Sequence, residues 1–241
     1  MNLGSACVAA LIVVGGGFGT ASAGTETILS CDFDAEPIDQ IIGTGGAIVG
    51  QPTAIAFDAY VRSAPFATPS LEMADTWGTG ARAVTFEFLN DWEITTGVVD
   101  IAMDLEFQSM DNYQISVREF NGASQSFATL RFTLTGGVSH TDADGGAGII
   151  TTYSAGTATH LELSFDMDAR TCDVLLDGTP VLSDETFGIA DRGVGSVLVG
   201  LSHDADSTGV FSVDNLVVTA TETPSPVDPA SWAGTKASYR D

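Results

Sequence analysis

The sequence predicts an all-β protein folded as a two-sheet antiparallel β-sandwich. Apolar and polar residues alternate strictly over 99–108, as expected for a strand with one buried face and one exposed face. Clusters of Gly, Asp, Asn and Pro separate such runs, and no segment combines a helical period with caps at both ends. About ten short strands joined by turns are typical of a sandwich.

Each run of this kind is expected to form one strand. Strands are expected at 27–33, 53–61, 82–89, 99–107, 112–119, 126–134, 159–165, 171–177, 194–201 and 209–219. Turn-forming residues gather between them at 121–125, 142–148 and 204–209. The sequence shows no internal repeat, so these strands are assigned to one domain over 24–220.

The segment 1–23 has the pattern of a secretory signal peptide. An apolar run from Val8 to Val14 is followed by Ala21-Ser22-Ala23, a small-residue cleavage site. This run is far shorter than the ~20 residues that span a bilayer. We therefore expect a secreted protein, extracellular or periplasmic, with no membrane span once the signal is removed.

The last segment, 221–241, is expected to be a flexible tail outside the sandwich. Its start, TETPSPVDPAS, holds three prolines, which cannot continue a central strand. The remainder, which includes WAGTKASYR, is not a hydrophobic anchor.

The charge balance excludes two classes of partner. Thirty-two acidic residues face 8 Lys and Arg, for a net charge of −24. Such a charge repels nucleic acid and anionic lipid, so neither is an expected partner. The expected partner is therefore an extracellular glycan or a surface protein.

Two cysteines lie beyond the predicted signal peptide, and both fall on apolar strand faces. Cys31 alternates with Leu29 and Phe33, and Cys172 alternates with Val174. An exported protein can oxidise such a pair, and a bridge that closes so long a loop would contribute roughly 5 kcal/mol. Two alternatives stay open: a Cys31–Cys172 disulfide, or two separate buried thiols.

The segment 156–218 carries a family resemblance. It reads GTATHLELSFD, then RTCDVLLDGTPV, then GSVLVGL, and finally GVFSVDNLVV. This pattern resembles the C-terminal half of concanavalin A-like (laminin G-type) jelly-roll domains, although Ala158 stands where the family usually has Trp. The resemblance implies a tight hairpin at Asp177-Gly178 and makes His160 a structural strand residue.

The resemblance also implies a structural Ca²⁺. In related jelly rolls, acidic residues on the adjacent N- and C-terminal strands hold this ion. The matching positions are Asp34 and Asp214, and Asn215 could add an oxygen ligand. The alternative is that these carboxylates are simply exposed at strand ends. Two further Asp-rich segments, 140–145 and 203–206, are better explained as solvated turns.

A glycosidase motif of this fold group is present only in part. Laminarinase-like glycosidases of this fold use E-x-D-x-E on one strand, so that the carboxylates share one cleft. The nearest match is 102–106, with Asp104 and Glu106 in place but Ala102 at the nucleophile position. The missing carboxylate argues against hydrolysis and leaves Asp104 and Glu106 as candidate ligand-binding residues.

Three aromatic residues are candidates for stacking on a sugar ring. Trp77 and Trp92 lie in polar turns and Tyr113 begins a strand, although tryptophan at a sandwich edge often closes the core instead. The sequence thus predicts a secreted, non-catalytic, lectin-like carbohydrate-binding module with a structural Ca²⁺. Two alternatives stay open: an adhesion or matrix module that binds protein, and a glycoside hydrolase-like enzyme.

Overall fold

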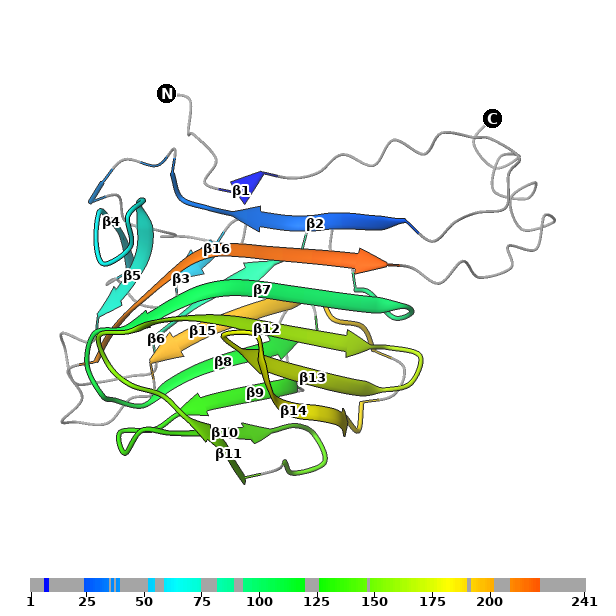
Figure 1. The fold of residues 1–241 in the computed structure, drawn as a ribbon. Helices are drawn as coiled ribbons and strands as arrows, with labels where there is room; N and C mark the ends of the chain where they lie inside the picture. Colours follow the sequence, from blue (N-terminus) through cyan, green and yellow to red (C-terminus); the bar gives the residue numbers. More distant parts are fainter. Residues whose placement is uncertain are drawn as a thin grey trace, which may run out of the picture.

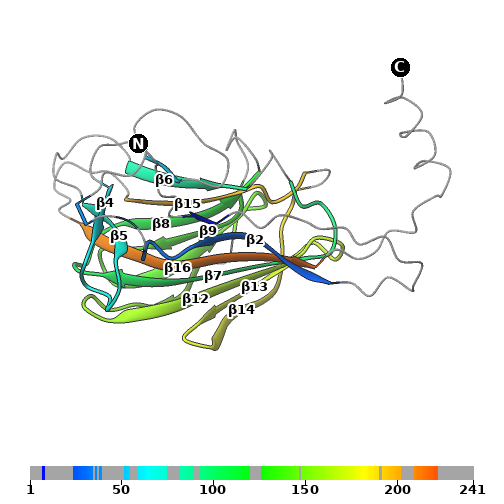
Figure 2. The ribbon, with the colours of Figure 1, turned by 90° about the horizontal axis from the view of Figure 1, so that it is seen from above.

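The fold is a sandwich of two antiparallel sheets, as the sequence predicts (Figure 1). The computed structural model describes residues 7–8, 24–34, 36, 38–39, 52–54, 59–74, 82–88, 93–119, 126–146, 148–189, 192–201 and 209–221. No helix occurs among these residues. Seen from above, β6, β15, β8 and β9 form one layer, and β16, β7 and β12 belong to the other (Figure 2).

The larger sheet has nine strands and contains both the first and the last strand of the described chain. Its order is β1-β2-β16-β7-β12-β13-β14, with β5 paired to β16 and β4 paired to β5. Its strands are β1 (Cys7–Val8), β2 (Thr25–Cys31), β4 (Ala59–Arg62), β5 (Ser70–Ala74), β7 (Val98–Phe107), β12 (Ala158–Asp166), β13 (Thr171–Leu176), β14 (Thr179–Thr186) and β16 (Val210–Thr221).

The smaller sheet has seven strands in the order β11-β10-β9-β8-β15-β6-β3. These are β3 (Pro52–Ala54), β6 (Arg82–Glu87), β8 (Tyr113–Arg118), β9 (Ser126–Phe132), β10 (Gly137–Thr141), β11 (Gly148–Thr152) and β15 (Ser196–Leu201).

The expected strands form, and the strands that sequence reasoning missed are either mostly exposed strands at a sheet edge or short strands. The expected strand 53–61 is two strands, β3 and β4, which lie in different sheets. The strands β11 and β14 lie at sheet edges and are mostly exposed or half-buried, so neither shows a period of two. Two further strands, β5 and β10, are only five residues long.

The strand β7 runs through the middle of the larger sheet and supplies its inner face to the core. Its inward side chains, Val99, Ile101, Met103, Leu105 and Phe107, are each at most 1% exposed. The Phe107 ring lies 4.5–5.8 Å from four other aromatic rings, measured between centroids. The alternation seen in the sequence is therefore confirmed residue by residue.

The first long strand lies beside the last, as the jelly-roll resemblance implies. β2 pairs antiparallel with β16, so that Cys31 is opposite Leu216. β1, which belongs to the predicted signal peptide, pairs with β2 through Cys7 and Cys31. The rest of that signal peptide, and the predicted tail beyond Thr221, lie outside the described residues. No helix in the described part of the chain is long and apolar enough to cross a membrane.

The disulfide alternative for Cys31 and Cys172 is wrong. Cys172 is a free and fully buried thiol, whereas Cys31 is disulfide-bonded. The two residues sit on β13 and β2, and three strands separate these in the larger sheet. Neighbouring strands are about 4.8 Å apart, so these residues are well beyond the ~7 Å Cα separation that a disulfide tolerates.

The aromatic cluster around Phe107 predicts a large loss of stability on truncation. We expect Phe107→Ala to lower the free energy of unfolding by about 3–5 kcal/mol, because it leaves a cavity among four rings. Urea denaturation would measure this change. Leu134→Ala is the matched control, since Leu134 is 58% exposed and its loss is expected to change stability by less than ~0.5 kcal/mol. Equal effects of the two substitutions would contradict this placement of the core.

Candidate functional site

The outward face of β7 carries acidic residues at alternate positions. Asp100, Asp104 and Glu106 lie on this face and are exposed or half-buried, with Ala102 between them. The register of the sheet places His160 of β12 on one side of Asp104 and Asp214 of β16 on the other. Residues far apart in the sequence therefore meet at the middle of the larger sheet.

The carboxylate of Asp104 is held by partners on both sides. One oxygen, Oδ1, lies 2.6 Å from His160 Nδ1, and the other, Oδ2, accepts a hydrogen bond of 2.8 Å from Asn215 Nδ2. The side chains of Asp104 and His160 are 32% and 45% exposed, so solvent reaches the pair. The His160 Nε2 atom lies 4.0 Å from the Glu162 carboxylate. His160 is thus a strand residue, as expected, and also part of this polar site.

Polar contacts continue along β7 on either side of this pair. At one end, Ser164 Oγ donates to Asp100 Oδ1 over 2.6 Å. At the other end, Gln108 Nε2 donates to Glu72 Oε2 over 3.0 Å, linking β7 to β5 across β16. The result is a band of hydrogen-bonding side chains that crosses the strands of the larger sheet. We call this band, made of Glu72, Asp100, Asp104, Glu106, Gln108, His160, Glu162, Ser164 and Asn215, the polar face.

Asp214 lies beside Asp104 on the neighbouring strand β16 and is almost completely buried, with 1% of its surface exposed. Its carboxylate accepts hydrogen bonds from the Asn215 backbone N–H at 2.8 Å and from Thr68 Oγ1 at 2.9 Å. Burial, with smaller contributions from the charges of Asp34 and Asp104, raises the pKa of Asp214 to about 6.

A bulge in the closing strand creates this arrangement. The pairing of β16 with β7 shifts register between Asp214 and Val217, and Asn215 has a φ of +50°. A bulge re-aims the side chains of the strand that contains it. The polar pair Asp214-Asn215, which the sequence analysis singled out, therefore marks a true break in the strand.

The three predicted calcium-binding positions lie near one another. Asp34 is close enough to Asp214 for their charges to interact, and Asn215 follows Asp214 directly. However, the carboxylates of Asp34, Asp104 and Asp214 do not form a group of donor atoms within 4.8 Å of one another among the described residues. A calcium site at Asp34, Asp214 and Asn215 therefore stays a prediction.

Of the three predicted sugar-stacking residues, the structure describes only Tyr113. Tyr113 is 1% exposed, and its hydroxyl donates to the Ser109 carbonyl oxygen at 2.7 Å. Its assignment to a ligand-binding face is therefore wrong, because its ring packs into the core beside Phe107. Trp77 and Trp92 lie outside the described residues.

No family model matches this chain, and no curated protein sequence matches it significantly.

Solved structures do share its fold. A carbohydrate esterase from the Shiga toxin-encoding bacteriophage phi24B superposes with a TM-score of 0.55 at 11% identity, over 83% of this chain and 100% of its own. An alginate lyase from Corynebacterium sp. gives 0.51 at 12% identity, over 74% of this chain and 91% of the lyase. A sialidase gives 0.54 at 13% identity, over 81% of this chain, which spans only 18% of the sialidase. Identities this low establish a shared jelly-roll β-sandwich and nothing finer.

The raised pKa of Asp214 predicts a pH-dependent effect of its removal. The folded pKa of about 6 exceeds the ordinary value of 3.8, so the folded state binds this proton more tightly. Stability from this group is therefore lost as pH rises from about 4 to about 6, by roughly 3 kcal/mol. In a chelator, we expect the stability of Asp214→Asn relative to wild type to improve by about that amount between pH 4 and pH 7.

Urea denaturation at both pH values measures this difference. Asp184→Asn, at an exposed position of β14, is the control and is expected to show no such trend. A stability difference for Asp214→Asn that does not change with pH would contradict the proposed burial of its charge.

Proposed function

We propose that this protein is a secreted, non-catalytic carbohydrate-binding module that holds its glycan on the polar face. The observation that carries the proposal is the set of solvent-accessible donors and acceptors around Asp104 and His160. They project from central strands, which are rigid supports for a binding site. The fold supports the same class of function, because the superposed structures include a carbohydrate esterase, an alginate lyase and a sialidase.

The chemistry of these side chains suits sugar hydroxyls. Carboxylates accept hydrogen bonds, while imidazole and amide groups also donate, and a pyranose ring presents both kinds of partner on each hydroxyl. Asp104 is already oriented by His160 and Asn215, so little side-chain entropy is lost when a ligand binds. Glu106 lies two residues along the same face.

The charge of the chain narrows the class of glycan. A net charge of −24 disfavours polyanions such as alginate. Arg62, on β4 at one side of the polar face, is already paired with Asp39 and Glu72. We therefore propose a neutral or cationic glycan rather than an anionic one.

The catalytic alternative has one feature in its favour. Ala102 lacks the carboxylate of the glycosidase motif, but Glu162 of β12 lies directly opposite Ala102 in the register. The neighbouring strand β12 therefore supplies a carboxylate beside Ala102, where the glycosidase motif has its own. Glycoside hydrolysis, with Glu162 and Glu106 as the two carboxylates, is the second candidate function.

Substitutions on the polar face test the leading proposal. We expect Asp104→Asn and Glu106→Gln each to weaken binding of a soluble β-glucan or of chitosan by about tenfold, because each removes a charged acceptor. Affinity electrophoresis against β-glucan, chitosan and alginate measures the effect, with Asp184→Asn as the matched control. Binding that none of these variants changes, or binding to alginate alone, would contradict the proposal.

The same samples separate the alternatives. Release of reducing ends from the bound glycan, lost in Glu162→Gln, would replace the non-catalytic assignment with hydrolysis. Binding to no glycan would leave the adhesion alternative, with a surface protein as partner.

A structural Ca²⁺ at Asp34, Asp214 and Asn215 is a further part of the proposal. It is supported by the side-by-side placement of β2 and β16 and by the burial of the Asp214 carboxylate, which raises its pKa. A divalent cation there would offset the repulsion between the carboxylates, and the Asn215 side-chain oxygen could complete part of its shell.

Calcium is expected to raise the melting temperature of the protein. A ligand that binds only the folded state stabilises it in proportion to RT ln(1 + [L]/Kd). Differential scanning fluorimetry in excess CaCl₂ against excess EGTA measures the shift, which we expect to disappear in Asp34→Asn and to persist in Asp184→Asn. The absence of any shift in the wild-type protein would contradict the calcium site.

A further inference from the structure

The strand β10 places a histidine inside the protein without any hydrogen-bond partner. His140 has no exposed surface, and neither Nδ1 nor Nε2 has a hydrogen-bond partner. A buried polar group without a hydrogen-bond partner lowers the stability of the folded protein. The solvated turn expected over 140–145 is present in the exposed residues after Asp142, whereas His140 is buried.

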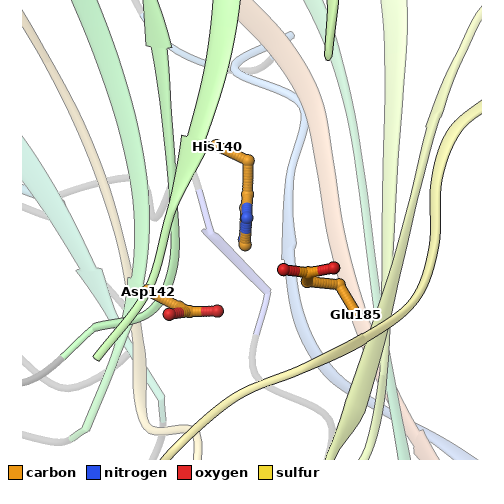
Figure 3. A group of neighbouring side chains, drawn as sticks. All are labelled: His140, Asp142 and Glu185. Atoms are coloured by element: carbon orange, nitrogen blue, oxygen red, sulfur yellow. The ribbon is translucent and has the colours of Figure 1, made fainter. Parts of the chain in front are cut away.

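Two carboxylates face this imidazole. Asp142 follows β10 directly, and Glu185 comes from β14, the last strand of the other sheet. A ligand atom from each of the three side chains lies within 4.8 Å of the other two. Figure 3 shows the imidazole and the two carboxylates directed toward a common space. Both carboxylates are half-buried, so this space adjoins solvent.

We propose that His140, Asp142 and Glu185 form a binding site for a divalent transition-metal ion of the zinc type, which links the two sheets. One imidazole nitrogen and two carboxylate oxygens are ligands that zinc accepts, whereas calcium prefers oxygen alone. A tetrahedral ion with bonds of ~2.1 Å separates its ligand atoms by about 3.4 Å, so modest side-chain rotation closes the observed spacing. Water from the solvent side would complete the coordination.

Local structure orients one of the ligands in advance. The Asp142 Oδ1 atom accepts backbone hydrogen bonds from Asp144 at 2.7 Å and from Gly145 at 2.9 Å. This leaves Oδ2 for the ion. Gly146 has a φ of +97°, and a Cβ atom at this position would clash with the His140 carbonyl oxygen.

The charges also balance with a dication. A neutral imidazole and two carboxylates sum to −2, and the ion brings the site to zero. Cys172 is the backbone partner of Glu185 across β13 and β14, but its sulfur is not one of the three clustered ligand atoms. The ion would thus hold β10 of one sheet against β14 of the other through three side chains.

Metal titration of the full chain tests this site. Protein freed of metal with a chelator is titrated with Co²⁺, in excess Ca²⁺ to occupy other acidic positions. We expect one Co²⁺ per chain, with the visible d–d absorption of a tetrahedral ion, displaced by Zn²⁺. Zn²⁺ should also raise the melting temperature.

Variants decide whether these residues are the ligands. Glu185→Gln is expected to weaken Co²⁺ binding by more than about tenfold, and the neighbouring exposed Asp184→Asn is expected to leave it unchanged. His140→Leu should abolish binding while the metal-free protein stays folded or gains stability, because it removes the unsatisfied imidazole.

Three results would overturn the proposal: no Co²⁺ bound by the wild-type chain, equal losses in Glu185→Gln and Asp184→Asn, or unchanged binding in both Glu185→Gln and His140→Leu. The outcome is independent of glycan binding, since the polar face and this cluster share no residue.

Discussion

Apolar and acidic side chains alternate along β7, so the packing of the core determines the position of the proposed binding surface. Each inward residue from Val99 to Phe107 is buried against the second sheet, and each intervening residue faces outward. Because the side-chain period of a strand is two, a slip of one residue would exchange the apolar and acidic faces. Burial of the apolar face thus fixes the register, and the register in turn places His160 and Asp214 beside Asp104.

Two buried ionisable groups lie where distant segments meet. Asp214 lies opposite Asp104, at the bulge where β16 passes from β5 toward β2, and His140 lies where β10 approaches β14. In both places the fold keeps a polar group out of water with incomplete compensation. Such groups persist in proteins when a ligand or a function offsets their unfavourable free energy. The two proposed cations would provide that compensation, with different ligand chemistry at each place.

Sequence reasoning predicted the fold well where burial governs the pattern. The all-β sandwich, the exposed acids of β7 and the proximity of Asp34 to Asp214 follow from alternation and from the jelly-roll resemblance. Edge strands such as β14 were not predicted, because too few of their residues are buried to give the sequence a period of two. The assignment of Tyr113 was wrong because the sequence does not say what covers a strand end. The disulfide alternative for Cys172 was wrong because the sequence does not say how far apart two strands lie.

The interactions of the polar face depend on register between strands that are remote in the chain. His160 lies 56 positions from Asp104, and Asn215 lies 111 positions from it. No local pattern links these residues, so the sequence could indicate Asp104, Glu106 and Asn215 separately but not their arrangement around His160. The cluster around His140 was also not predicted from the sequence, because Glu185 lies on β14, a strand that the sequence did not predict.

The central claim is that a glycan binds across β7, β12 and β16, and the imidazole of His160 reports on it directly. The most direct measurement is the NMR spectrum of the histidine side chains during titration with a soluble β-glucan or chitosan oligosaccharide. The account predicts that the His160 ring signals shift with the ligand while those of buried His140 stay in place. Saturable binding that leaves the His160 signals unmoved would contradict it.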